Sequence, residues 1–242
     1  MPAVELLERP ASGRVFTLEA RVRLGDVDTD GRLRLDAAAR HFQDAAADDA
    51  TDASLDRRYG WLVRRTLLDV SEPPRLGEAI TVDTWCTALG VAWAERRSQL
   101  VGARGGLIDA VSLWVQIELS TGRPAKVRED FSGPYGPSAN GRAVSASLSI
   151  PDPPAAARAL APWPLRRSDL DVYAHVNNAA TWAFVEDHVE LGDRRGVAEI
   201  EYLQPISDGT TVEVVAEPRD GSCRWLRSAD GIVTTAARWT PA

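Results

Sequence analysis

The sequence predicts an α+β fold made of two similar units in tandem, each an antiparallel sheet that wraps one long helix. Two observations indicate this architecture. A helix followed by several strands is predicted twice along the 242 residues. Matches between the two stretches also stay in order while the spacing between them falls from 143 to 130 to 125 residues. Two copies of one unit, the second with shorter loops, explain this pattern. The matched positions are Asp28 with Asp171, Gln43 with Glu186, 80–83 with 210–213, and Trp114 with Trp239.

The first unit reads as a strand, a helix and then further strands. Apolar and polar residues alternate over 16–24, which is typical of a strand with one buried face. The stretch from Leu35 to about Ala50 is rich in Ala, contains no Gly or Pro, and predicts the long helix. Turn signals rich in Gly and Pro then separate four further strands. These strands are expected at 61–70, 78–86, 91–101 and 106–119.

The second unit repeats this order with shorter connections. A helix is expected near 178–191, and strands are expected near 197–203, 210–216, 222–228 and 231–239. The segment between the units is rich in Pro, Gly, Ser and Ala, which predicts a linker that wraps more than it packs. The predicted division is an N-terminal unit over 1–125, a linker over 126–163 and a C-terminal unit over 164–242.

The clearest functional signal is Asp171-Val-Tyr-Ala-His175-Val-Asn177-Asn178, just ahead of the second helix. Histidine is the side chain whose unperturbed pKa suits proton transfer near neutral pH. The alternative interpretation is that Asn177 or Asn178 only caps the helix and that His175 is a hydrogen-bonded surface residue. The first copy lacks these groups, which favours a single site in the second unit. Where the second copy has Tyr173, His175, Asn177 and Asn178, the first has Asp30, Arg32, Arg34 and Leu35.

The order of elements, with Asp-x-x-x-His-Val-Asn-Asn at the helix entrance, resembles the hotdog fold, and the tandem arrangement resembles the acyl-acyl carrier protein thioesterase family. The resemblance departs from the family pattern at two places. Tyr173 stands where the family has asparagine, and Gln204-Pro205-Ile206 stands where an acidic residue is expected. The other supporting segments are Phe42-Gln43-Asp44-Ala45-Ala46, Gly60-Trp61, 74–85, Ser112-Leu113-Trp114-Val115, Thr121-Gly122-Arg123-Pro124 and Glu201-Tyr202.

The resemblance implies a thioesterase of fatty acid biosynthesis and lipid metabolism. Such an enzyme releases an acyl group from acyl carrier protein or coenzyme A by water attack at one site in the C-terminal unit. Asp171 and His175 match the catalytic positions. Tyr173, Asn177 and Asn178 are expected to support the site or position the substrate.

Thioester hydrolysis needs an activated water or a carboxylate nucleophile, donors for the oxyanion, and a dry groove for the acyl chain. Asp171 is a candidate base or nucleophile, and His175 is a candidate to orient water or to protonate the leaving thiolate. Backbone N–H groups at the helix start after Asn177 are free by geometry and are candidate oxyanion donors. Tyr173 offers a hydroxyl in place of the missing amide, unless it only packs outward.

Two other functions stay open. One is a catalytically degenerate hotdog protein that binds acyl chains or a partner, as the departures at Tyr173 and Pro205 allow. The other is a hotdog hydratase or dehydratase, which acts on the acyl chain instead of the thioester bond. Acyl chain length and the choice between the two carriers do not follow from the sequence.

The charge and composition of the chain limit the classes of partner that are expected. The net charge of −7 argues against a general nucleic-acid binder. The pair Arg166-Arg167 lies just before the motif and is a candidate contact for an acidic carrier or a phosphate. No segment has the length and apolarity of a signal peptide or membrane span, so a cytoplasmic protein without membrane insertion is expected. Besides the intrachain pseudo-dimer, a further homodimer is an open expectation.

No cofactor or metal is expected. Cys86 and Cys223 have no CxxC spacing, so buried or incidental thiols are expected instead of a metal site or a nucleophile. Asp26, Asp28 and Asp30 resemble the start of a calcium loop, but Ala37 stands at its twelfth position, where that loop needs glutamate. An Asp-rich turn is the better interpretation.

Overall fold

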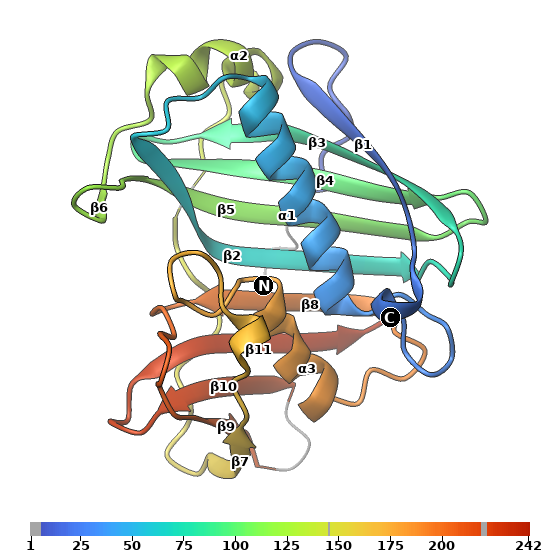
Figure 1. Ribbon diagram of the computed structural model, residues 1–242, viewed down its shortest axis with the longest axis vertical. Coiled ribbons are helices and arrows are strands. Elements are labelled where there is room, and N and C mark those ends of the chain that lie inside the picture. The colour runs from blue at the N-terminus through green and yellow to red at the C-terminus, as the bar shows by residue number, and fades with distance from the viewer. Residues whose placement is uncertain (1–5, 145, 219–221) are drawn as a thin grey trace.

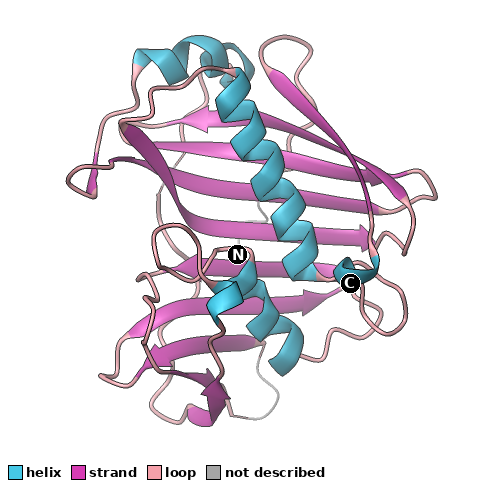
Figure 2. Cartoon of the chain, in the orientation of Figure 1, coloured by secondary structure: helices cyan, strands magenta, loops and turns pink. Residues whose placement is uncertain are grey.

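A computed structural model describes residues 6–144, 146–218 and 222–242 of the chain. The chain folds into two halves that repeat one arrangement (Figures 1 and 2). The first half contains β1 Val15–Arg21, η1 Leu24–Asp26, α1 Leu35–Asp52, β2 Tyr59–Glu72, β3 Ala79–Leu89, β4 Trp93–Gly102, β5 Leu107–Glu118, β6 Arg123–Pro124 and α2 Glu129–Ala139. The second half contains β7 Arg158–Trp163, η2 Arg167–Asp169, η3 Ala180–Trp182, α3 Ala183–His188, β8 Gly196–Tyr202, β9 Val212–Ala216, β10 Cys223–Ser228 and β11 Val233–Pro241.

The strands of both halves form one antiparallel sheet. Its order is β1-β3-β4-β5-β2-β8-β11-β10-β9-β7, so the second half repeats the first in reverse across the centre. The halves join where β2 pairs with β8, from Arg65 opposite Glu201 to Val70 opposite Gly196. Helices α1 and α3 lie on the same face of the sheet (Figure 1). The predicted tandem hotdog architecture, with two sheets joined in one chain, is therefore confirmed.

Helix α1 forms where the sequence predicted it. Its buried stripe includes Leu35, Ala38, Phe42, Ala45 and Asp49, at the three- and four-residue spacing of one helix face. Small Ala side chains let the helix lie close to the sheet, and they cost little side-chain entropy in a helix. The helix crosses β3, β4, β5 and β2 (Figure 1).

The second half carries a much shorter helix than the sequence predicted. The expected helix near 178–191 is a 3-10 turn followed by the six residues of α3. Val189 is already extended, and Gly192 follows with a φ of 57°. Helical periodicity continued through 191, but the chain leaves the helix early and turns back toward the first half at Arg194.

Two elements lie inside the segment predicted to be a linker. Helix α2 forms despite Pro134 and Pro137, because Phe131 and Tyr135 anchor it. The Phe131 ring lies 4.4 Å from Trp61 and 4.3 Å from Tyr135 between centroids. Strand β7 pairs with β9 at the edge of the sheet. An edge strand tolerates proline because one side of it needs no ladder partner, which is why Pro162 obscured it in the sequence.

The hydrophobic core is shared by the two halves. It runs from the underside of α1 through the central strands to α3, and joins Leu68 and Ile108 to Ile200 and Trp239. Across the described part of the chain, no helix has both the length and the apolar composition needed to cross a bilayer.

Leu68→Ala should lower the free energy of unfolding by about 2 to 5 kcal/mol, because Leu68 is fully buried in β2 opposite Ala198 of β8. Urea denaturation is the measurement. A single transition is expected, since the halves share this core. Leu160→Ala on exposed β7 is the control and should change stability by no more than about 0.5 kcal/mol. Equal effects of the two substitutions would contradict a joint core at β2 and β8.

Candidate functional site

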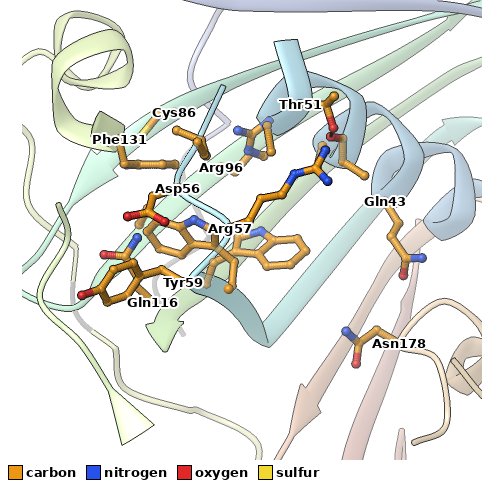
Figure 3. Close-up of a pocket in the computed structure, with 18 of the residues that line it drawn as sticks. Gln43, Thr51, Asp56, Arg57, Tyr59, Cys86, Arg96, Gln116, Phe131 and Asn178 are labelled. Atoms are coloured by element: carbon orange, nitrogen blue, oxygen red, sulfur yellow. Dashed lines mark hydrogen bonds between the residues drawn. The ribbon is translucent and has the colours of Figure 1, made fainter. Parts of the chain in front are cut away.

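A cavity of about 970 Å³ opens between α1, the first-half sheet and the loop 171–178 (Figure 3). It follows α1 from Gln43 to Thr51, about 12 Å along the helix axis. Ala46, Ala47 and Ala50 form this wall, and their small side chains leave the space open. The cavity therefore exists because one face of α1 carries almost no side-chain volume.

The remaining walls come from distant parts of the sequence. Trp61, Trp114 and Phe131 supply apolar surface on the side of the sheet and α2. Polar groups, including Arg96 and Gln116, stand among them. The second half contributes Asp171, Val172, Tyr173, Asn177 and Asn178 at the other end. A long, partly apolar space thus ends at the sequence motif.

Asp171 organises the motif loop. Its Oδ1 accepts hydrogen bonds from the backbone N–H of Tyr173 at 2.9 Å and of His175 at 3.3 Å. The Asp171 N–H donates to the His175 carbonyl at 2.8 Å. This is an aspartate-centred turn. Among the described interactions Oδ2 accepts no hydrogen bond, so one carboxylate oxygen of Asp171 is available at the cavity.

Asp28 builds the same turn in the first half. Its Oδ1 accepts the N–H groups of Asp30 and Arg32, both at 2.9 Å. Its Oδ2 accepts from Nε of Arg194 at 2.8 Å. Burial by itself would raise the pKa of Asp28, but the bonds from Arg32 and Arg194 outweigh it and lower the pKa below its usual value. The two aspartates match in geometry and differ in what faces the second oxygen.

Side chains fill the space in front of the Asp28 loop. Arg194 bridges Asp28 to Glu186 of α3, with Nη1 2.6 Å from Glu186 Oε1. Glu186 Oε1 also accepts the N–H of Leu35, the first residue of α1, at 2.5 Å. Burial raises the pKa of Glu186 in spite of its pairing with Arg194. We call Asp28, Glu186, Arg194 and Leu35 the closed copy, and the cavity end at Asp171 the open copy.

The paired asparagines hold the helix entrance. Asn177 Oδ1 accepts the N–H of Ala179 at 2.8 Å, which fixes the turn that leads into η3. The Tyr202 hydroxyl donates to the carbonyl of Asn178 at 3.0 Å and fixes it from the sheet side. No described residue accepts the Asn178 N–H. The helix entrance therefore carries a backbone donor without a described partner, at a residue that lines the same cavity as Asp171.

His175 and Tyr173 occupy different surroundings. The backbone of His175 is bonded to Asp171, and its half-buried ring is not among the described side chains that line the cavity. Tyr173 lines the cavity mouth, is 62% exposed, and its hydroxyl has no described hydrogen bond. The structure thus brings Asp171, Tyr173, Asn177 and Asn178 to the cavity, whereas His175 is not part of its described lining.

Arg166 and Arg167 lie outside the cavity lining that the structure describes. Both side chains are exposed at η2, and Arg166 Nε is 3.4 Å from Asp169 Oδ2. Their position is on the surface before the motif loop, where a partner can reach them.

The far end of the cavity contains a buried ion pair. Asp49 is completely buried and accepts from Nη1 of Arg96 at 2.7 Å and from Nε of Arg14 at 2.6 Å. Cys86 lies nearby, and burial raises its pKa to about 11. Its thiol is therefore protonated at neutral pH and is no nucleophile. Within residues 6–144, 146–218 and 222–242, no group of three or more His, Cys, Asp or Glu side chains is placed to hold a metal ion.

Analysis of the sequence missed the contribution of the first half. Gln43 and the alanines of α1 come to the motif only because the two halves pack together. One signal was available, since the repeat aligns Gln43 with Glu186. Nothing in the sequence indicated that Trp61, Arg96 and Phe131 form one wall of a cavity, because aromatic and arginine residues more often serve the core or the surface.

Ala174→Gly should raise the free energy of unfolding by a few tenths to about 1 kcal/mol, because Ala174 has a φ of 57° and left-handed backbone is unfavourable for alanine. Gly31 occupies the same turn position in the first half with a φ of 75°. Gly31→Ala is the matched control and should lower stability, although a Cβ there would only meet Leu76 at 3.9 Å. Urea denaturation of both variants is the measurement, and a stabilising Gly31→Ala would contradict the argument.

Comparisons with known proteins agree with the observed fold. The family model described as the acyl-ACP thioesterase N-terminal domain matches residues 13–135, and that of the C-terminal domain matches residues 154–237. An uncharacterized protein of Mycobacterium tuberculosis is 32% identical over 223 residues, which are 90% of this chain and 89% of that protein. A chloroplastic palmitoyl-acyl carrier protein thioesterase of Gossypium hirsutum is 27% identical, over 95% of this chain and 64% of that protein.

A solved structure supports the same fold. The acyl-ACP thioesterase from Bacteroides thetaiotaomicron superposes with a TM-score of 0.79 at 18% identity, over 93% of this chain and 96% of that one. At 18% identity, this structural similarity is evidence for the fold alone. Since the two family models together cover most of the chain, it belongs to the acyl-ACP thioesterase family of thioester hydrolases.

Proposed function

We propose that this protein hydrolyses the thioester of an acyl group carried on acyl carrier protein, at a single site formed by the open copy. One observation carries the proposal. Asp171 and Asn178 both line one long cavity, and neither Oδ2 of Asp171 nor the N–H of Asn178 has a described hydrogen bond, whereas the equivalent groups in the first half are bonded to Arg194 and Glu186. Family membership supplies the reaction class.

In the proposed reaction, Asp171 acts as a general base. It takes a proton from a water molecule, and the resulting hydroxide forms a bond to the thioester carbonyl carbon. The carbonyl oxygen becomes an oxyanion, which the Asn178 N–H at the helix entrance stabilises. The C–S bond then breaks and leaves a carboxylic acid and a thiolate, which takes up a proton. The net reaction converts thioester and water into acid and thiol.

His175 is proposed as the source of that last proton. The His175 N–H donates to Asp171 Oδ1 and the His175 carbonyl accepts the N–H of Asp171, so the two residues belong to one hydrogen-bonded turn. The side chain of Asn177 and the carbonyl of Asn178 are proposed to hold the loop and the helix entrance in position, while the Asn178 N–H is left for the oxyanion.

The acyl chain is proposed to lie along α1. Trp61, Trp114 and Phe131 face this path together with the alanines of the helix, and they offer apolar surface for a hydrocarbon. The thiol-bearing arm would then enter past Val172 and Tyr173, which are exposed at the mouth. This orientation places the thioester carbonyl at the helix entrance.

Acyl carrier protein is the favoured carrier because named relatives act on it, among them the palmitoyl-acyl carrier protein thioesterase of Gossypium hirsutum. Arg166 and Arg167 are proposed as a contact for its acidic surface, since both are exposed just before the motif loop. Coenzyme A remains the second candidate carrier. Thiol release from matched panels of acyl-acyl carrier protein and acyl-CoA distinguishes the two carriers. The double substitution Arg166→Ala with Arg167→Ala should raise KM for acyl-acyl carrier protein and leave KM for acyl-CoA unchanged.

Asp171→Asn and His175→Ala should each lower thiol release by about 100- to 10,000-fold, as expected when a positioned base or acid is lost. Asp28→Asn is the matched control in the closed copy and should reduce stability but keep the turnover of the folded protein. Steady-state thiol release with melting curves for each variant is the measurement. Equal losses of turnover from Asp28→Asn and Asp171→Asn in folded protein would refute the single site, and no thiol release by the unaltered chain would leave an acyl-binding protein.

Tyr173→Phe should lower kcat and leave KM close to unchanged if the hydroxyl replaces the amide that the family has at this position. A tyrosine hydroxyl has one donor and reaches farther than asparagine, so it can contact the thioester oxygen only from the cavity mouth. The same kinetic measurement applies. An unchanged kcat would assign the exposed ring to contact with the incoming arm of the carrier.

A further inference from the structure

We propose that Gln43 of α1 completes the site by donating its side-chain N–H to the thioester oxygen beside Asn178, and that its neutral amide keeps this copy open. This rests on the proposed thioester hydrolysis. Gln43 belongs to the first half, so the site would be composite, with the base on one half and a second oxyanion donor on the other.

The internal repeat identifies the equivalent positions. The same spacing of 143 residues relates Asp28 to Asp171, Leu35 to Asn178 and Gln43 to Glu186. The structure supports these pairs, because the two aspartates build the same turn and the two helices follow it on one face of the sheet (Figure 1). Each helix faces the loop of the other half. Glu186 on α3 reaches the entrance of α1, and Gln43 on α1 lines the cavity beside the entrance that precedes α3.

The closed copy shows where a side chain from this helix position reaches. Glu186 Oε1 accepts the N–H of Leu35 at 2.5 Å. The glutamate oxygen therefore occupies the place next to a helix-entrance N–H that a substrate oxyanion would occupy in the other copy. Arg194 pairs with this carboxylate, so the charge of Glu186 is balanced within the closed copy.

The open copy has the same turn and helix entrance, but glutamine stands at the position of Glu186. Gln43 lines the large cavity and an adjoining small one of about 30 Å³, and the side-chain amide has no described hydrogen bond. The Asn178 N–H also has none among the described residues. Figure 3 shows Gln43 extending from α1 toward Asn178. Two unused donors thus stand at the end of the cavity where Asp171 lies.

The difference of one functional group explains the difference between the copies. A carboxylate is an acceptor only, so at position 43 it would bind the Asn178 N–H as Glu186 binds Leu35, and it would repel a developing oxyanion. An amide carries two N–H donors and no charge, so it can stabilise that oxyanion together with Asn178. Glutamine at this position is therefore what the proposed chemistry requires, and glutamate is what closes the site.

The test uses the full-length chain and steady-state thiol release from an acyl-acyl carrier protein that the unaltered protein hydrolyses. Gln43→Met keeps the length of the side chain and removes its donors. It should lower kcat by about 100- to 1,000-fold with KM within a few-fold, the usual effect of losing an oxyanion donor. Gln43→Glu should lower kcat at least as much, whereas Gln43→Asn, which keeps the amide, should retain more activity than Gln43→Met.

A second readout does not depend on activity. In amide NMR spectra, Gln43→Glu should move the Asn178 N–H signal in the direction of a bond to a carboxylate, for which the Leu35 N–H of the same protein is the reference. Melting curves establish that each variant is folded. Glu186→Gln is the matched control and should lower stability without lowering kcat, because the closed copy takes no part in the reaction.

The outcomes separate this inference from the function on which it rests. Absence of thiol release by the unaltered protein overturns the proposed function itself. With an active protein, full kcat in Gln43→Met, or an unmoved Asn178 signal in Gln43→Glu, overturns the role of Gln43 alone. An equal loss of kcat from Glu186→Gln would also overturn it, since the effect would then pass through helix packing.

Discussion

The pairing of β2 with β8 is the constraint on which the rest of the structure depends. It runs antiparallel from Arg65 opposite Glu201 to Val70 opposite Gly196, and it joins the strands of the two halves into one sheet. Because the join is antiparallel, the two halves face each other across an approximate two-fold axis. Each helix is thereby placed beside the aspartate loop of the other half. Without this pairing neither the cavity nor the closed copy would exist, since both are made of residues from both halves.

The two ends of this symmetric frame differ through charge and side-chain volume. At the Asp28 end, Arg194 donates to both Asp28 and Glu186, and Glu186 accepts the N–H of Leu35 at the start of α1. These polar groups therefore all have partners within the chain. At the Asp171 end the helix supplies Gln43 and alanines, and the corresponding groups remain available to a ligand. The two copies of the turn therefore differ in whether their polar groups already have partners within the chain. The unlike fates of the two copies follow from a few residues and leave the backbone of the turns unchanged.

The cavity depends on α1 in two ways. The helix has the length to span the first-half sheet, and its alanines leave a channel where larger side chains would fill the space. Helix α2, held by Phe131 and Tyr135 against Trp61, supplies apolar wall surface, and the ion pair of Asp49 with Arg96 closes the floor at that end. In the second half, α3 is too short to form a comparable channel. The helices therefore decide which half can hold a long ligand.

The sequence by itself determined the tandem fold, the strands, α1 and the motif loop, because hydrophobic periodicity and an internal repeat are local properties of the chain. It also indicated that only the second copy carries His175 and the paired asparagines. Only the tertiary structure decided that α2 and β7 form within a segment rich in Pro and Gly, since aromatic packing and edge pairing override local propensity there. It likewise decided that α3 ends early, that His175 is not part of the described cavity lining, and that Gln43 meets the loop 171–178. The meeting of Gln43 with this loop depends on contacts between residues more than 100 positions apart, which the β2 and β8 pairing creates and no local pattern encodes.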